Sequence, residues 1–213
     1  MIKCFILLGP PGSGKGTQAN KIIKKFNFLY LSTGDILRNA EKYDENIRNI
    51  LKKGKLIPDS LIIKLITEYI KKNNIENGIL FDGFPRTINQ AKTLDLILSK
   101  NNAKISIIFI ISLNLKETIL RIKSRRVCSI CGTNYSIEHN KSTDKCKICH
   151  GKLFQRNDDE NEKVIINRFL IYEKQIKPIL LYYKKSNFLV NINGLEKEEE
   201  IFKQITKNII KRN

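Results

Sequence analysis

The sequence predicts an α/β fold, in which a doubly wound five-stranded parallel sheet carries a small cysteine-rich insert. Three observations support this prediction. Short apolar runs alternate with amphipathic stretches, which is the pattern of consecutive strand and helix units. A glycine-rich segment, residues 9–17, follows the first apolar run directly. Four cysteines gather in residues 124–159, a segment without a counterpart in the repeating units.

The predicted elements follow this alternation along the whole chain. Strands are expected at residues 2–8, 28–31, 78–82, 104–111 and 188–192. Helices are expected at about 15–25, 34–40, 44–53, 58–72, 88–100, 114–125, 161–184 and 196–211. Ser32 and Thr33 suit a helix N-cap, and Pro178 is expected to bend or interrupt the long helix. Because the strands are parallel, the ligand crevice is expected at their carboxyl ends.

The length and composition indicate one globular domain with small inserts. The chain has 213 residues, of which 41% are hydrophobic, and this is enough for one core. No window of eighteen apolar residues exists, so no membrane association is expected. The first strand is expected to begin at Ile2, so we expect no signal or transit peptide in this sequence. We therefore expect a cytoplasmic protein.

The net charge of +18 has three possible explanations. A basic chain can bind nucleic acid, it can bind small polyanions such as nucleotides, or it can reflect AT-rich codons that favour Lys, Asn and Ile. The lysines are spread along the whole chain, whereas a nucleic-acid footprint would cluster. We favour codon bias for most lysines and ligand binding for selected arginines, with no nucleic-acid partner.

The segment Gly9 to Thr17 reads Gly-Pro-Pro-Gly-Ser-Gly-Lys-Gly-Thr, which predicts a phosphate-binding loop. Small residues let the backbone N–H groups point inward, and the following helix N-terminus and Lys15 add positive charge. An ordinary glycine turn would not explain the lysine between a strand and a helix. Gly16 stands where Ser or Thr would hold Mg²⁺, which excludes a typical GTPase or motor ATPase. Mg²⁺ is therefore expected on phosphate oxygens and waters, oriented by Asp82 at the end of a strand.

Four of the five cysteines form a paired pattern, Cys128-x2-Cys131 and Cys146-x2-Cys149. This spacing is typical of a structural Zn²⁺ site. Two disulfides are the alternative, but they require an oxidising compartment, which nothing else in the chain indicates. Four thiolates leave no open position for water, so the metal would be structural and would supply the fold of the insert. The fifth, Cys4, lies in the first strand and is expected in the core.

Arginines are more informative than lysines, because guanidinium groups bind phosphate in a bidentate manner and stay charged when desolvated. Arg48 and Arg212 are interpreted as solvated surface residues, and Arg126 is left open. The candidates for one shared cleft are Arg38, Arg86, Arg121, Arg125, Arg156 and Arg168.

Four motifs in this order resemble the adenylate kinase family over essentially the whole chain. They are the phosphate loop, Leu31 to Arg38, Gly54 to Asp59, and Phe81 to Thr87 followed by Gln90. The four-cysteine insert resembles the zinc-bearing long lid of bacterial-type members. The resemblance implies a P-loop nucleoside monophosphate kinase with a core of residues 1–31, 58–123 and 160–213, an AMP-binding insert of 32–57 and a lid of 124–159.

The resemblance also implies the reaction ATP + AMP ⇌ 2 ADP with Mg²⁺, carried out by a monomer. ATP would be bound by Gly12, Ser13, Gly14, Lys15, Gly16, Thr17, Arg121, Arg125, Asn134, Tyr135 and Glu196. AMP would be bound by Thr33, Arg38, Lys55, Leu56, Ile57, Gly83, Phe84, Pro85, Arg86, Gln90, Arg156 and Arg168. The catalytic set would be Lys15, Arg38, Asp82, Arg86, Arg125, Arg156, Asp158, Asp159 and Arg168.

In these roles Arg38 and Arg86 would hold the AMP phosphate, and Gln90 would recognise the adenine edge. The phosphate of AMP is already anionic near neutral pH, with a second pKa of about 6, so no general base is required. Catalysis would then depend on positioning and charge neutralisation, with a lid that excludes water.

Two departures from the family pattern bear on these roles. The stretch between Arg156 and Arg168 is one residue longer than the pattern, and an extra residue inside a helix would turn Arg168 by about 100°. Glu196 stands where family members often have Lys or Gln near the adenine of ATP, although a backbone carbonyl there can still serve.

Two other functions compete with this interpretation. A GTP:AMP phosphotransferase or another nucleoside monophosphate kinase would share the loop and the arginines. A zinc-ribbon nucleic-acid-binding protein would explain the charge and the cysteines, but not the phosphate loop or residues 82–86.

Overall fold

The central element of the computed structural model, which describes residues 1–40, 45–53, 55–136 and 145–212, is a five-stranded sheet. Its strands run in the order β2-β3-β1-β4-β8, and every pairing is parallel. The strands are β1 (Ile2–Leu8), β2 (Leu29–Ser32), β3 (Ile79–Asp82), β4 (Ala103–Ser112) and β8 (Leu189–Asn193). The predicted fold class is confirmed.

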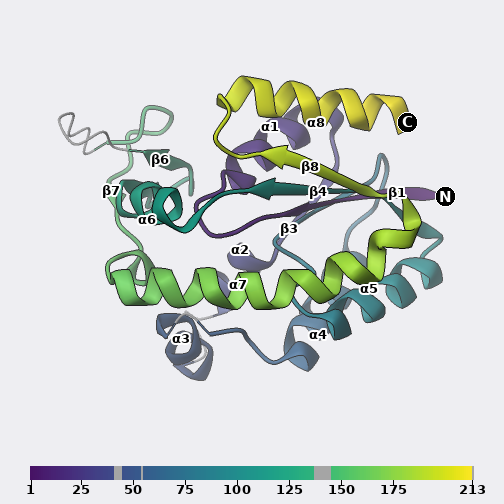
Figure 1. Cartoon of the computed structure of the whole chain (residues 1–213), viewed down its shortest axis with the longest axis horizontal. Helices are drawn as coiled ribbons and strands as arrows, with labels where there is room; N and C mark the ends of the chain where they lie inside the picture. The colour runs from purple at the N-terminus through teal and green to yellow at the C-terminus, as the bar shows by residue number, and fades with distance from the viewer. Residues whose placement is uncertain (41–44, 54, 137–144, 213) are drawn as a thin grey trace.

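Helices cover both faces of this sheet (Figure 1). On one face lie α1 (Lys15–Phe26) and α8 (Glu198–Arg212), and on the other α4 (Asp59–Lys72), α5 (Ile88–Lys100) and α7 (Glu162–Tyr183). Alternate residues of β1 enter the two cores: Cys4 and Ile6 belong to one buried cluster, Phe5 and Leu7 to the other. Burial on both faces explains why the strands read as continuous apolar runs.

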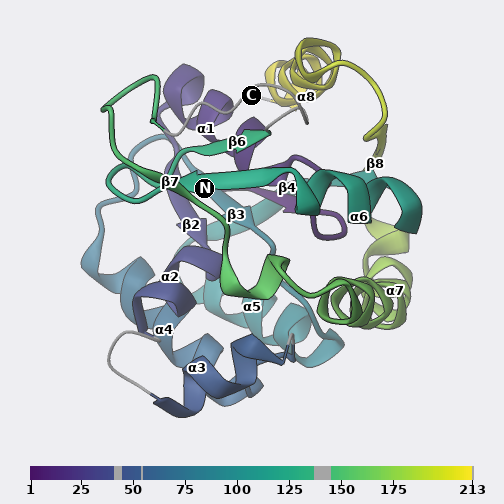
Figure 2. The ribbon, with the colours of Figure 1, turned by 90° about the vertical axis from the view of Figure 1, so that its left-hand side faces the viewer.

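Two helices and a small sheet lie beyond the carboxyl ends of the strands, at the left of Figure 1. The helices are α2 (Thr33–Ala40) and α3 (Glu45–Lys52). The sheet is antiparallel with the order β6-β5-β7, formed by β5 (Arg125–Cys128), β6 (Asn134–Ser136) and β7 (Leu153–Phe154). Figure 2, turned to face this edge, shows both groups of elements around the strand ends.

One sequence-based helix boundary is wrong, and one predicted interruption does not occur. The helix predicted for 114–125 is α6 (Leu115–Lys123), because Arg125 and Arg126 leave the helix to pair with β6. The long helix is not interrupted at Pro178. Ile176 and Ile179 are buried on either side of the proline, and their packing outweighs the loss of one backbone hydrogen bond. Two 3-10 turns, η1 (Asn157–Asp159) and η2 (Lys184–Ser186), flank this helix.

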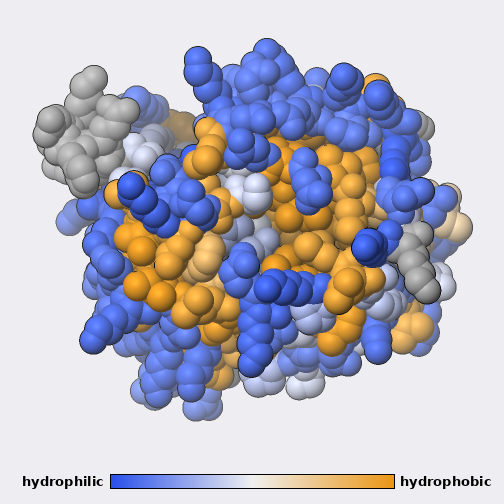
Figure 3. All heavy atoms as spheres, viewed as in Figure 1, coloured by the Kyte–Doolittle hydropathy of each residue, from blue (hydrophilic) through white to orange (hydrophobic). Residues whose placement is uncertain are grey.

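Hydrophilic side chains cover α8 in Figure 3, while an apolar band lies between α8 and α7 over the edge strand β8. Leu189 and Val190 of that strand are half-buried. Among the described helices, none has the combination of length and apolarity that crossing a bilayer requires.

Candidate active site

The phosphate loop joins β1 to α1 and folds around the ammonium group of Lys15. Gly12 and Gly14 have φ of +77° and +88°, a left-handed conformation that a side chain would strain. Lys15 Nζ donates hydrogen bonds to the carbonyl oxygens of Gly9 at 2.7 Å and Pro10 at 2.9 Å, and to Ser13 Oγ at 3.2 Å. The loop is thus already curled around a positive charge.

The environment of Lys15 lowers the pKa of its ammonium group. Burial, together with the charges of Arg86, Arg125 and Arg168, lowers the pKa of Lys15 to about 8, although Asp82 opposes the shift. Three arginines from separate parts of the chain therefore lie close enough to Lys15 to affect its pKa. Such a concentration of positive charge suits a polyphosphate.

Asp82 ends β3 beside this loop. Its Oδ2 accepts a hydrogen bond from Tyr30 Oη at 3.0 Å. Burial raises the pKa of Asp82, and the Lys15 charge and the Tyr30 hydrogen bond oppose the rise. A methyl group built on Gly16 would lie 3.8 Å from Asp82 Oδ2 and 3.7 Å from Asn134 Nδ2, so Gly16 lies between the core acid and the small sheet.

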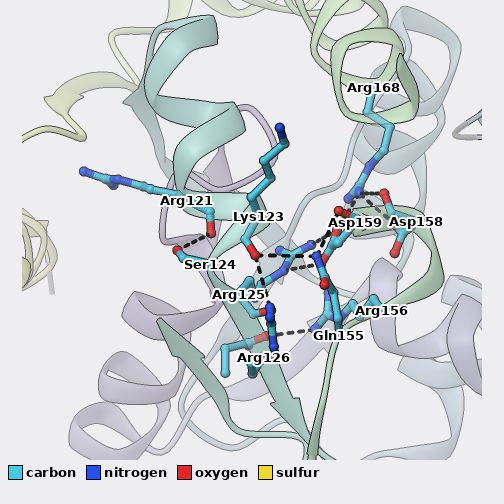
Figure 4. A network of polar contacts seen from close by, with 11 residues as sticks. Arg121, Lys123, Ser124, Arg125, Arg126, Gln155, Arg156, Asp158, Asp159 and Arg168 are labelled. Atoms are coloured by element: carbon cyan, nitrogen blue, oxygen red, sulfur yellow. Dashed lines mark hydrogen bonds and ion pairs between the residues drawn. The ribbon is translucent and has the colours of Figure 1, made fainter. Parts of the chain in front are cut away.

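Asp159 links three parts of the chain (Figure 4). Its carboxylate, with no exposed side-chain surface, accepts from Arg125 Nε at 2.7 Å and Nη2 at 2.5 Å, and from Arg168 Nη1 at 3.0 Å. Arg168 Nη1 also lies 2.9 Å from Asp158 Oδ2. The longer stretch before α7 therefore does not turn Arg168 away from this cluster.

Three other candidates have definite partners: Asn134 of β6, Arg121 of α6, and Arg156, which lies between β7 and η1. Arg156 donates through Nη2 to Asn134 Oδ1 at 2.9 Å, so both lie beside the loop at Gly16. Arg121 pairs with Glu117 on α6 at 3.2 Å and points away from the Asp159 cluster in Figure 4. A methyl group on Gly12 would lie 3.6 Å from Arg121 Cβ, which places α6 against the phosphate loop.

A second pocket lies between α2, residues 55–57 and the turn after β3. Arg86 donates from Nε to the Gly83 oxygen at 2.7 Å and from Nη2 to Thr33 Oγ1 at 3.3 Å. The Phe84–Pro85 peptide bond in this turn is cis. The lining includes most of the residues predicted for AMP: Thr33, Lys55, Leu56, Ile57, Phe84, Arg86 and Gln90. Arg38 lies on α2, but its side chain lies outside the described part of the structure.

The four paired cysteines point to one centre. Their sulfur atoms all lie within 4.8 Å of one another, with Cys128–Cys149 at 3.4 Å and Cys131–Cys146 at 3.6 Å. A tetrahedron of thiolates around Zn²⁺, with bonds of about 2.3 Å, has edges of about 3.8 Å. All four are free cysteines rather than disulfides, so this cluster has the geometry to hold a metal.

The sequence predicted that Tyr135 contacts ATP, but its side chain contacts the cysteine cluster. Its hydroxyl is 3.2 Å from Cys146 Sγ and accepts from the Lys147 N–H at 3.1 Å. Although burial raises the pKa of Cys146, hydrogen bonds from Tyr135 and from the backbone N–H groups of Cys149 and Ile148 lower it to about 6. The thiolate, which is the metal-binding form, is thereby favoured.

Glu196 lies in the turn after β8, and its carboxylate accepts a hydrogen bond from Gln204 of α8.

Two residues of the site were missed by sequence reasoning. Tyr30 binds Asp82, and Asp59 accepts from Gln90 Nε2 at 2.7 Å. Asp59 ends the motif Gly54 to Asp59, but neither contact could be predicted from the sequence, because each joins residues far apart in the chain.

Comparison with known proteins connects this geometry to a family. The family model described as Adenylate kinase matches residues 7–188. The chain belongs to the adenylate kinase family. A protein named Adenylate kinase from Methanothrix thermoacetophila is 41% identical, covering 97% of this chain and 98% of the relative. One of the same name from Thermosipho africanus is 37% identical, covering 98% and 99%. One from Clostridium tetani is 39% identical, covering 95% and 96%.

Membership of the adenylate kinase family makes this chain a phosphotransferase. The match includes the phosphate loop from Leu7 onward, the pocket around Arg86 and the four-cysteine insert. The recognition made from the sequence motifs is thus confirmed.

Proposed function

We propose that this adenylate kinase transfers the γ-phosphoryl group of ATP to the phosphate of AMP and produces two ADP. The observation that carries the proposal is the mutual proximity of Lys15, Asp82, Arg86, Arg125 and Arg168 at the carboxyl edge of the sheet. The phosphate loop contributes Lys15 to this group, and Arg86 of the same group lines the second pocket together with Gln90.

In this proposal the residues divide into two binding sites and one transfer site. Residues 12–17, with Arg121, Arg125, Asn134 and the turn at Glu196, bind ATP. The Tyr135 side chain, which the sequence assigned to ATP, contacts the cysteine cluster instead. Thr33, Arg38, residues 55–57, residues 83–86 and Gln90 bind AMP. Arg156 and Arg168, oriented by Asp158 and Asp159, neutralise the charge that develops between the two nucleotides.

The reaction needs no general base. An AMP phosphate oxygen attacks the γ-phosphorus, the bond from that phosphorus to the β–γ bridging oxygen breaks, and the leaving ADP keeps the electron pair. Positioning and charge neutralisation supply the acceleration. When bound with ATP, Mg²⁺ neutralises phosphate charge, and Asp82 orients its waters.

The three-part organisation belongs to the same proposal. Residues 32–57 and 124–159 act as inserts that close over a core and exclude water. The four-cysteine cluster binds Zn²⁺ as a structural ion that holds the lid together. The enzyme works as a cytoplasmic monomer on free nucleotides, without a nucleic-acid partner.

A coupled assay tests the proposal. ATP and Mg²⁺ are supplied with AMP, GMP, CMP or UMP, and ADP formation is followed. Rapid turnover with AMP alone is the expected result. Turnover with a different monophosphate would keep the kinase class and overturn the acceptor. GTP in place of ATP tests the donor, since a GTP:AMP phosphotransferase would prefer it.

A further inference from the structure

We infer that Asp59 is a positioning residue that fixes the amide orientation of Gln90 and thereby sets selectivity for a 6-aminopurine over a 6-oxopurine. The inference rests on the proposed function, in which Gln90 faces the base of the acceptor nucleotide. It depends on hydrogen bonds that join the start of α4 to the start of α5.

The amide of Gln90 is held at both of its polar atoms. Its Oε1 accepts from the Arg86 backbone N–H at 2.7 Å, and its Nε2 donates to Asp59 Oδ1 at 2.7 Å. The backbone N–H can only donate, and the carboxylate can only accept. An amide turned by 180° would place donor against donor and acceptor against acceptor, so only one orientation satisfies both neighbours.

Asp59 is itself held in place. Its Oδ2 accepts from Thr87 Oγ1 at 2.8 Å and from Asn89 Nδ2 at 3.2 Å. The Thr87 hydroxyl in turn accepts from the Gln90 backbone N–H at 3.1 Å and caps α5. Both carboxylate oxygens thus have fixed donors, and the carboxylate cannot rotate away from Gln90 without losing several hydrogen bonds.

The fixed amide still has capacity for a ligand. Gln90 is 3% exposed and lines the second pocket. Each amide atom makes one hydrogen bond within the described chain, which leaves one lone pair on Oε1 and one N–H on Nε2. Adenine offers an amino donor beside a ring-nitrogen acceptor, and this pair matches a glutamine amide. A 6-oxopurine replaces the amino donor with an acceptor, which Oε1 repels.

The test is the substitution Asp59→Asn, assayed with AMP and IMP as acceptors. IMP carries the 6-oxo group without the 2-amino group of GMP, so it isolates the effect of amide orientation. An asparagine amide can donate to Gln90 as well as accept from it, so only the Arg86 N–H still favours one orientation of the Gln90 amide, and the turned amide becomes less unfavourable. We expect the ratio of kcat/KM for AMP to that for IMP to fall about tenfold or more. KM for AMP should rise, while KM for ATP stays within about twofold, because the change lies outside the phosphate loop.

Asn89→Ala is the matched control, because it removes one donor to Asp59 and leaves the Gln90 amide held at both atoms. It should keep the selectivity of the wild type. Asp59→Ala is a second variant that removes the acceptor altogether, and the melting temperature of each variant shows whether it folds. An unchanged AMP to IMP ratio in both Asp59 variants, or an equal fall in Asn89→Ala, would overturn the inference. If the wild type does not prefer AMP to IMP, the proposed acceptor is wrong, and this outcome is distinct from failure of the Asp59 variants alone.

Discussion

Removing the charge of Asp159 tests the role of the buried carboxylate between Arg125 and Arg168. Asp159→Asn keeps the shape of the side chain and leaves two guanidinium groups without their shared anion. Asp159 is fully buried, whereas the side chains of Arg125 and Arg168 are 17% and 19% exposed. Breaking a buried ion pair costs about 3–5 kcal/mol. We expect about 3 kcal/mol, the lower end, because both arginines retain some water.

For a chain of this size, each kcal/mol shifts the melting temperature by about 2–4 °C, so Asp159→Asn should lower it by about 6–12 °C. Thermal unfolding followed by circular dichroism, with urea unfolding for the free energy, measures the effect. The matched control is Asp158→Asn. Asp158 is 28% exposed and, among the residues that the structure describes, forms an ion pair only with Arg168, so its loss should cost at most about 1 kcal/mol. Equal stability of the two variants would refute the argument that burial makes Asp159 the stronger contributor.

Three further predictions concern the phosphate loop, the second pocket and the cysteine cluster. The pKa of Lys15 is lowered to about 8 in the free protein, and a bound triphosphate should raise it again. ATP affinity measured by calorimetry should therefore be constant below pH 8 and fall about tenfold per pH unit above it; a flat profile from pH 7 to 9.5 would contradict this. Arg86→Ala should lower kcat/KM by about 10²-fold, about 3 kcal/mol, while the melting temperature stays unchanged; an unchanged kcat/KM would remove the phosphate role. Stripping metal with a chelator should increase proteolysis within residues 125–154, while residues 9–26 stay protected; equal sensitivity with and without metal would rule out a structural ion.

Most of the fold follows from local patterns. The alternation of apolar runs with amphipathic stretches places all five strands of the main sheet, since burial on both faces demands apolar residues from Cys4 to Leu8 of β1. The phosphate-binding loop could also be predicted from the sequence, because the left-handed backbone at Gly12 and Gly14 favours glycine.

The features that the sequence did not predict depend on distant contacts. The strands of the small sheet are two to four residues long. A strand this short gives no periodic signal in the sequence, so the small sheet was not predicted, although the cysteine pattern beside it was. The contact of Asp59 with Gln90 joins residues 31 positions apart. In the sequence, Asp59 looks like an ordinary acid at the start of a helix, and only the packing of α4 against α5 gives it a partner.

Strand β6 also has a consequence for the accuracy of the reaction. Adjacent strand residues point to opposite faces: Tyr135 contacts Cys146, while Asn134 lies beside Gly16 and binds Arg156. One peptide bond therefore separates the residue that contacts the cysteine cluster from the residue that covers the phosphate loop. If the lid excludes water as proposed, the partition of ATP between transfer and wasteful hydrolysis depends on an ion that touches neither nucleotide. Metal supply would then affect the yield of ADP per ATP consumed, apart from any effect on how fast the enzyme turns over.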